Sequence, residues 1–151
     1  MKKVVLLSDI HGHREVLSCI DALYPAADYY LHCGDSLVDA DDLRPFASVK
    51  GNCDRTDFPL YRELEIEGHK IFMCHGHTLG NADLNTMSMT AKTRGCDLVF
   101  FGHLHLFIDE TVNGVRLINP GSAASNHDGS RPCFAYIEIT QDVVNVQRID
   151  L

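Results

Sequence analysis

Short apolar runs that end at polar residues recur along the chain and predict β-strands. The first covers Val4 to Leu7 and leads directly into Ser8-Asp9-Ile10-His11-Gly12. Similar runs predict strands over residues 28–33, 47–50, 60–67, 70–74 and 97–101. The last third of the chain alternates apolar and polar positions, which predicts strands over residues 107–112, 115–118, 134–140 and 143–149. The Asn113-Gly114 pair between two of these strands is typical of a hairpin turn.

Three segments between the strands have the spacing of helices. The apolar positions of residues 16–23 fall on one helical face. Residues 84–91 repeat this pattern, with Asn81 as the expected N-cap and Gly95 as the expected stop. A short helix is expected to start in the acidic stretch 39–42. The strand–helix–strand order predicts parallel strands, which gather ligand sites at their carboxyl ends.

Composition and charge restrict the class of protein. The chain has 45% hydrophobic and 23% charged residues, as an ordinary globular protein does, and its length predicts a single domain over residues 1–151. A formal net charge of −8 argues against binding to long nucleic acid, which is gripped through its phosphates. No apolar segment is long enough to span a membrane.

The N-terminus and the cysteines indicate the compartment. The first apolar run ends at Asp9, which is too early for the apolar region of a signal peptide. The six cysteines include no CxxC pair. We therefore expect reduced thiols and a cytoplasmic protein.

Side chains that commonly bind metal ions follow several of the predicted strands. Alternate residues of a strand face the same side, so Asp9 and His11 can converge on one point. Five more such side chains lie at strand ends or in the turns after them: Asp35, Asn52, His75, His103 and His105. We expect these seven side chains to enclose a pair of metal ions. Their carboxylate, amide and imidazole donors suit Mn, Fe, Zn, Co or Ni better than Ca or Mg.

Five motifs, each with a glycine in or beside it, carry these residues, and they occur in this order: Asp9-Ile10-His11, Gly34-Asp35, Gly51-Asn52-Cys53-Asp54, His75-Gly76-His77 and Gly102-His103-Leu104-His105. The ordered set, which spans residues 9–105, resembles the calcineurin-like metallophosphoesterases. The small size, the Gly-Asn-Cys-Asp variant and residues 119–122 (Asn-Pro-Gly-Ser) resemble the compact phosphodiesterase branch of that family. The resemblance implies an α/β fold, a two-sheet β-sandwich flanked by helices in α/β/β/α order.

The resemblance also implies a ligand set for each ion. The first ion would be held by Asp9, His11, Asp35 and His105. The second would be held by Asp35, Asn52, His75 and His103, so that Asp35 bridges the two. The implied reaction is hydrolysis of a small phosphate diester by in-line attack of a metal-bridging hydroxide. Manganese is our first expectation for both ions, and Zn, Fe, Ni and Co are the alternatives.

One motif residue departs from the wider family, in which a His often follows the metal-binding Asn and assists the reaction. Cys53 stands at that position here, although Asp54, which would orient such a His, remains. A thiol is a weak hydrogen-bond donor, so we expect a diester, with its lower charge, to be the better substrate. His77 either supplies part of the missing donor or is structural. We predict Asp54, Cys53 and His77 as catalytic residues, and Asn52, His77 and Arg131 as substrate contacts.

Other functions compete with this interpretation. A phosphomonoesterase or nucleotidase would use the same metal ions, and Cys53 counts against it. A non-catalytic protein-binding scaffold is the alternative from another class, because this branch also resembles the scaffold subunit of the retromer. Loss of a ligand would favour the scaffold, and none of the seven is missing. The sequence leaves open the physiological substrate, the metal, a homo-oligomeric state and the role of the long loop 119–132.

Overall fold

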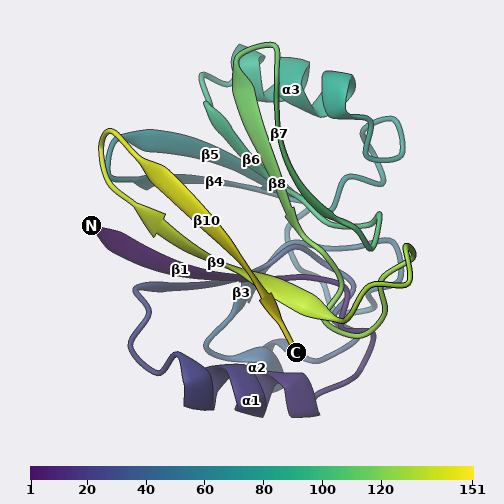
Figure 1. The fold of residues 1–151 in the computed structure, drawn as a ribbon. Coiled ribbons are helices and arrows are strands. Elements are labelled where there is room, and N and C mark those ends of the chain that lie inside the picture. The colour runs from purple at the N-terminus through teal and green to yellow at the C-terminus, as the bar shows by residue number, and fades with distance from the viewer.

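The computed structural model describes all of residues 1–151 and shows two five-stranded sheets that face each other (Figure 1). The first sheet has the strand order β10-β9-β1-β2-β3. Its strands are β1 (Lys2–Leu7), β2 (Tyr29–His32), β3 (Ala47–Ser48), β9 (Cys133–Ile139) and β10 (Val144–Asp150). Strands β1, β2 and β3 are parallel, whereas β9 is antiparallel to both β1 and β10.

The second sheet has the strand order β4-β5-β6-β8-β7. Its strands are β4 (Tyr61–Ile66), β5 (His69–Cys74), β6 (Leu98–Phe100), β7 (Phe107–Val112) and β8 (Val115–Pro120). The central strands β5, β6 and β8 are parallel, and the hairpins β4–β5 and β7–β8 add an antiparallel strand at each edge. Asn113 and Gly114, in the second hairpin, have φ angles of 53° and 75°, so the hairpin turn expected from the sequence is confirmed.

Alternate side chains of β1 enter different cores. Val4 and Leu6 belong to a core of 14 buried residues between the two sheets. Val5 and Leu7 belong to a core of 11 residues beneath α1 (Glu15–Leu23) and α2 (Ala40–Leu43). The remaining helix, α3 (Leu84–Thr93), covers the outer face of the second sheet over a third core of 10 residues. Figure 1 shows α1 and α2 on one side of the sandwich and α3 on the other, so the expected two-sheet fold flanked by helices is confirmed.

The start of α3 differs from the expectation. Asp83, not Asn81, is the N-cap: its carboxylate Oδ2 accepts a hydrogen bond of 2.9 Å from the backbone N–H of Thr86. An N-cap residue needs an extended backbone, whereas Asn81 has a left-handed φ of 57°. The expected N-cap was therefore wrong by two residues. None of the three helices has the length and apolar character needed to cross a membrane.

Candidate metal centre

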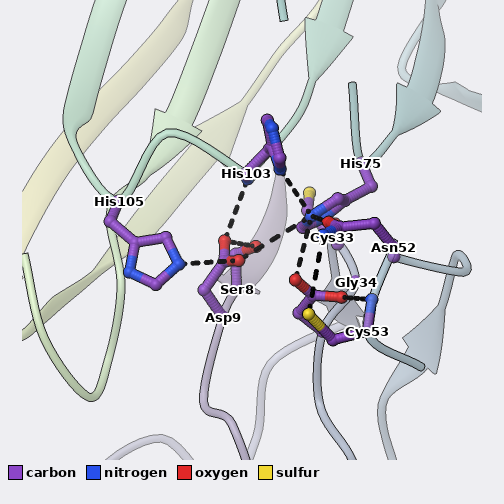
Figure 2. Close-up of polar contacts among 12 residues, drawn as sticks. Ser8, Asp9, Cys33, Gly34, Asn52, Cys53, His75, His103 and His105 are labelled. Atoms are coloured by element: carbon purple, nitrogen blue, oxygen red, sulfur yellow. Dashed lines mark hydrogen bonds and ion pairs between the residues drawn. The ribbon is translucent and has the colours of Figure 1, made fainter. Parts of the chain in front are cut away.

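The seven candidate ligands meet at one edge of the sandwich because they follow strands that end there. Asp9 and His11 follow β1, Asp35 follows β2, and His75 follows β5 directly. The other three lie in the segments after β3 and β6: Asn52, His103 and His105. Both sheets thus contribute candidate ligands, and Figure 2 shows the imidazoles of His75, His103 and His105 around Asp9.

The backbone at this edge is strained at the candidate ligands themselves. Five of the seven ligand residues have left-handed φ angles between 43° and 71°: Asp9, His11, Asp35, His103 and His105. A residue other than glycine adopts this conformation at a cost of about 1–3 kcal/mol, and such residues concentrate at functional sites. The fold therefore holds these five side chains in place against the local preference of the chain.

One half of the cluster is centred on Asp9. Its Oδ1 lies 3.2 Å from Nε2 of His105 and 3.7 Å from Nε2 of His11. The same two imidazole nitrogens are 3.3 Å apart. Nε2 of His11 is also 3.8 Å from Oδ2 of Asp35, which connects this half to the next one.

The other half is centred on His75. Its Nε2 lies 3.0 Å from Oδ1 of Asn52, 3.3 Å from Oδ2 of Asp35 and 3.3 Å from Nδ1 of His103. Donor atoms that share one cation at ~2.1 Å lie ~3.0–3.4 Å apart, so these separations match a common cation. Asp35 faces His11 in one half and His75 in the other, as a bridging carboxylate must.

An unpaired oxygen supports the same conclusion. Oδ1 of Asp9 is completely buried and has no hydrogen-bond partner, although Oδ2 accepts bonds from the Ser8 hydroxyl and the His103 backbone N–H. A buried carboxylate oxygen without a partner is costly and rare. Because this oxygen points into the ring of imidazole nitrogens, a divalent cation fits the donor set.

Three of the four imidazoles are oriented by contacts on their far side. Nδ1 of His75 donates to the Cys33 carbonyl at 2.7 Å, and Nδ1 of His105 donates to the Ser125 carbonyl at 2.9 Å. Nε2 of His103 faces Oδ1 of Asn81. Each contact places the proton on the outer nitrogen and leaves the lone pair of the inner nitrogen free for a metal ion. The sequence alone did not reveal these partners, since two are backbone carbonyls distant in the chain.

The charges of the cluster are strongly coupled. Burial alone raises the pKa of Asp9, but its contacts with His105 and His11 outweigh burial and hold that pKa far below its usual range. Burial also acts to raise the pKa of Asp35, and the contact with His75 lowers it overall. The carboxylates in turn raise the pKa of His75, despite its burial, and that of His105. Protons on these imidazoles therefore compete with a cation, and binding of a metal ion would release them.

Asp54 braces the loops rather than facing the cluster. Its Oδ2 accepts hydrogen bonds from the backbone N–H groups of Asp35 at 2.9 Å and Gly51 at 2.8 Å, and its Oδ1 accepts one from Leu37 at 3.1 Å. The carboxylate is thus used to fix the segment that carries Asp35. These contacts show Asp54 positioning the segment that carries Asp35, and its predicted catalytic role stays a prediction.

The 119–122 segment braces the opposite side of the cluster. The Asn119 side chain donates to the Gly102 carbonyl at 2.9 Å, and the Ser122 hydroxyl donates to the Asp9 carbonyl at 2.8 Å. Both side chains are buried. The segment therefore holds the turns that carry Asp9 and His103, which gives a structural role to part of the long loop.

The other predicted site residues lie at different distances from the cluster. Cys53 is exposed, and its Sγ lies within 4.8 Å of the ligand atoms of His11 and Asp35. His77 is half-buried beside His75, with 5.4 Å between the ring centres. Arg131 is not brought into the cluster: its guanidinium donates to the Leu151 carbonyl at 2.8 Å. Its predicted contact with substrate has no support in this geometry.

Gly51 provides a test of the bridging position. A Cβ at residue 51 would lie 2.1 Å from Oδ1 and 2.5 Å from the backbone nitrogen of Asp35, so Gly51→Ala must displace that residue. We expect about a hundredfold lower hydrolysis of an aryl diester and a destabilisation of ~1–3 kcal/mol in urea unfolding. Gly129→Ala is the control for activity: nothing lies within 4 Å of its added Cβ, and the cost of its left-handed φ of 79° falls on stability. Equal activity of the two variants would show that displacement of Asp35 is harmless.

Comparison with known proteins identifies relatives of the whole chain. The family model described as the calcineurin-like phosphoesterase superfamily domain matches residues 1–142. The chain is 34% identical over 152 residues to the probable metallophosphoesterase YsnB of Bacillus subtilis, with 97% of this chain and 90% of YsnB covered. It is 24% identical over 176 residues to the phosphodiesterase YfcE of Escherichia coli, with 97% and 91% covered.

Solved structures share the fold. A conserved protein of Streptococcus pneumoniae, described as a predicted phosphoesterase, superposes with a TM-score of 0.90 at 24% identity, over 99% of this chain and 89% of that one. Vps29 of Chaetomium thermophilum superposes with a TM-score of 0.80 at 17% identity, over 99% and 97%. The family match covers nearly the whole chain, and YsnB is similar over almost its full length. The chain belongs to the calcineurin-like phosphoesterase superfamily.

Proposed function

We propose that this protein is a dinuclear metal-dependent phosphodiesterase. The observation that carries the proposal is the buried Asp9 Oδ1, which has no hydrogen-bond partner and faces the imidazoles of His11, His75 and His105. Only a cation or protons on these imidazoles satisfy that oxygen. The family membership, which implies metal-dependent hydrolysis of phosphate esters, favours the cation.

Two overlapping donor sets define the proposed sites. Asp9, His11, Asp35 and His105 hold one ion, and Asp35, Asn52, His75 and His103 hold the other, with Asp35 shared. Manganese is the proposed ion for both. Two such ions, when bound, lower the pKa of a water between them toward ~7 and neutralise charge on a phosphate during in-line displacement.

The protein's own groups orient the substrate beside these ions. Oδ1 of Asn52 faces the second site, and its side-chain amide nitrogen lies on the Cys53 side, 3.5 Å from Sγ. His77 lines a cavity of about 580 Å³ together with Asn52, next to the cluster. Burial, followed by the nearby His75, lowers the pKa of His77, so its imidazole is neutral near pH 7. We propose that neutral His77 donates a hydrogen bond to an ester or phosphate oxygen.

The preference for a diester follows from Cys53. In the metal-free protein, partial desolvation and then the neighbouring Asp35 carboxylate raise the pKa of its thiol, which keeps the thiol protonated and uncharged. A neutral thiol is a weak donor and cannot stabilise the second negative charge of a monoester. A diester carries one charge and needs less assistance. The relative YfcE bears the name phosphodiesterase, which agrees with this preference.

The direct test of this function uses paired chromogenic substrates. With Mn²⁺ we expect kcat/KM for bis(4-nitrophenyl) phosphate to exceed that for 4-nitrophenyl phosphate by about tenfold or more. Equal or reversed preference would contradict the diester specificity and support the monoesterase alternative. Similarity to Vps29 at 17% identity shows the fold alone, and retention of all seven candidate ligands favours hydrolysis over a scaffold role.

A single substitution tests the account of residue 53. Cys53→His places a stronger donor, which can also be cationic, beside Asp35, and the exposed position accepts the larger ring. We expect the ratio of monoester to diester kcat/KM to rise about tenfold. Cys19→His, at an exposed position on α1, is the matched control and leaves the ratio unchanged. A ratio that stays constant in Cys53→His would remove residue 53 from the explanation of specificity.

A further inference from the structure

A second cavity adjoins the 52–53 segment at Cys53. It has a volume of about 460 Å³ and is lined by Leu37, Asp39, Cys53, Arg55 and Thr56. Cys53 connects it to the cluster, because its Sγ lies within 4.8 Å of ligand atoms of His11 and Asp35. Asn52 lines the cavity that contains His77, and the next residue, Cys53, lines this one. A diester has two ester arms, and two cavities adjoin the place where its phosphate would sit.

Arg55 differs from the other arginines of the chain. Seven of the eight donate hydrogen bonds to a carboxylate or a backbone carbonyl: Arg14, Arg44, Arg62, Arg94, Arg116, Arg131 and Arg148. Arg55 makes no hydrogen bond or ion pair, although it lines a cavity that also contains Asp39. Its guanidinium is thus free to bind an anion in the planar, two-pronged manner that suits phosphate.

The wall of this cavity is built together with the ligand segment. Leu37 lies in the cavity wall with a left-handed φ of 54° and is 42% exposed. Its backbone N–H donates to Oδ1 of Asp54, while Oδ2 of Asp54 accepts from the N–H of Asp35. One buried carboxylate thus fixes both the cavity wall and the bridging ligand. The cavity keeps a set position relative to the cluster.

The two cavities differ in whether their cationic side chain has a carboxylate partner. In the cavity with His77, the only cation is Lys50, whose Nζ lies 3.8 Å from a carboxylate oxygen of Asp57. In the cavity with Arg55, the cation is unpaired, and Asp39 offers an acceptor for hydroxyl groups. An arm with an anionic group and hydroxyls is therefore better accommodated beside Arg55.

From these observations we infer that the Arg55 cavity binds one ester arm of the substrate and that Arg55 pairs with a second phosphate on that arm. The inference rests on the proposed phosphodiesterase function and specifies its substrate class: a phosphodiester in which one alcohol carries a further phosphate group. Arg55 then acts in substrate selection and takes no part in bond cleavage.

The test uses 4-nitrophenyl phosphodiesters of straight-chain diols of two to six carbons, each made with a free terminal hydroxyl and with a terminal phosphate. We expect Mn²⁺-loaded protein to prefer the phosphate-terminated form by about tenfold in kcat/KM at one or more chain lengths. Arg55→Gln should abolish this preference, chiefly by lowering kcat/KM for the phosphate-terminated forms. Lys92→Gln, which removes an exposed unpaired cation from α3, should retain it.

A binding measurement separates the inference from the proposed function. Benzylphosphonate monoesters of the same phosphorylated diols cannot lose nitrophenolate, and calorimetry should give an about tenfold weaker Kd with Arg55→Gln than with the parent. No preference at any chain length, or a preference that survives in Arg55→Gln, would overturn the inference while diester hydrolysis stands. If no diester is hydrolysed, the proposed function fails, and the Kd ratio alone decides whether Arg55 binds the phosphate.

Discussion

His75→Ala is expected to lower kcat/KM for bis(4-nitrophenyl) phosphate by about a thousandfold, a loss of ~4 kcal/mol in transition-state stabilisation. The reason is geometric: Nε2 of His75 lies 3.0–3.3 Å from Asn52, Asp35 and His103, so its removal takes away the atom that all three share. A steady-state assay at saturating Mn²⁺ measures the loss.

His75 is buried, so a second variant must separate activity from folding. Asn52 is exposed, and Asn52→Ala removes a ligand without opening a core cavity. We expect a comparable loss of activity with an unchanged far-UV circular dichroism spectrum and thermal midpoint in the metal-free protein. His13→Ala, which removes an imidazole whose side chain is 58% exposed, is the matched control and keeps parental activity. Parental turnover in Asn52→Ala would place the site elsewhere.

Removal of metal ions is expected to have an effect of the same size. Protein treated with a chelator and then dialysed should lose about 99.9% of its diesterase activity. The acidic and basic side chains that remain cannot supply the charge stabilisation of two cations. Addition of Mn²⁺ should restore the activity. It should also raise the thermal midpoint, because an ion that binds only the folded state stabilises it by ~2.7 kcal/mol at a hundredfold excess over its Kd.

Thermal stability should rise with bound metal because a cation would satisfy the buried carboxylate of Asp9. Without a cation, only protons on the surrounding imidazoles can satisfy the buried Oδ1 of Asp9. The control is Mg²⁺ at the same concentration, which suits this nitrogen-rich donor set less well and should restore less activity. Full activity of the chelated protein would contradict a metal-dependent mechanism.

The sequence predicted most of what brings the ligands together. Asp9 and His11 follow an apolar strand whose burial is evident from Val4 to Leu7, and parallel strands carry such residues to one edge. The motif order then indicated the two-sheet fold. Strand and helix periodicity is a local property, so these elements can be recognised from neighbouring residues alone.

What the sequence did not reveal depends on contacts between distant segments. Asn81 is of a residue type that commonly caps helices, but its backbone is left-handed and its side chain contacts His103. The position of Asp54 in its motif suggested a catalytic role, but its carboxylate accepts hydrogen bonds from three backbone N–H groups. Nothing in the sequence indicated a role for Arg55, because a guanidinium is seen to be unpaired only when the groups around it are placed in space. Contacts of this kind depend on loop geometry, which leaves no periodic pattern in the sequence and so cannot be predicted from it.

The central claim is that seven side chains from both sheets enclose two cations. Its most direct test is the number of divalent ions bound per chain, measured by inductively coupled plasma mass spectrometry after titration with Mn²⁺ and removal of the excess. We expect two ions for the parent protein and fewer than two for His75→Ala. A parent protein that retains no ion, or retains only one at saturation, would contradict it.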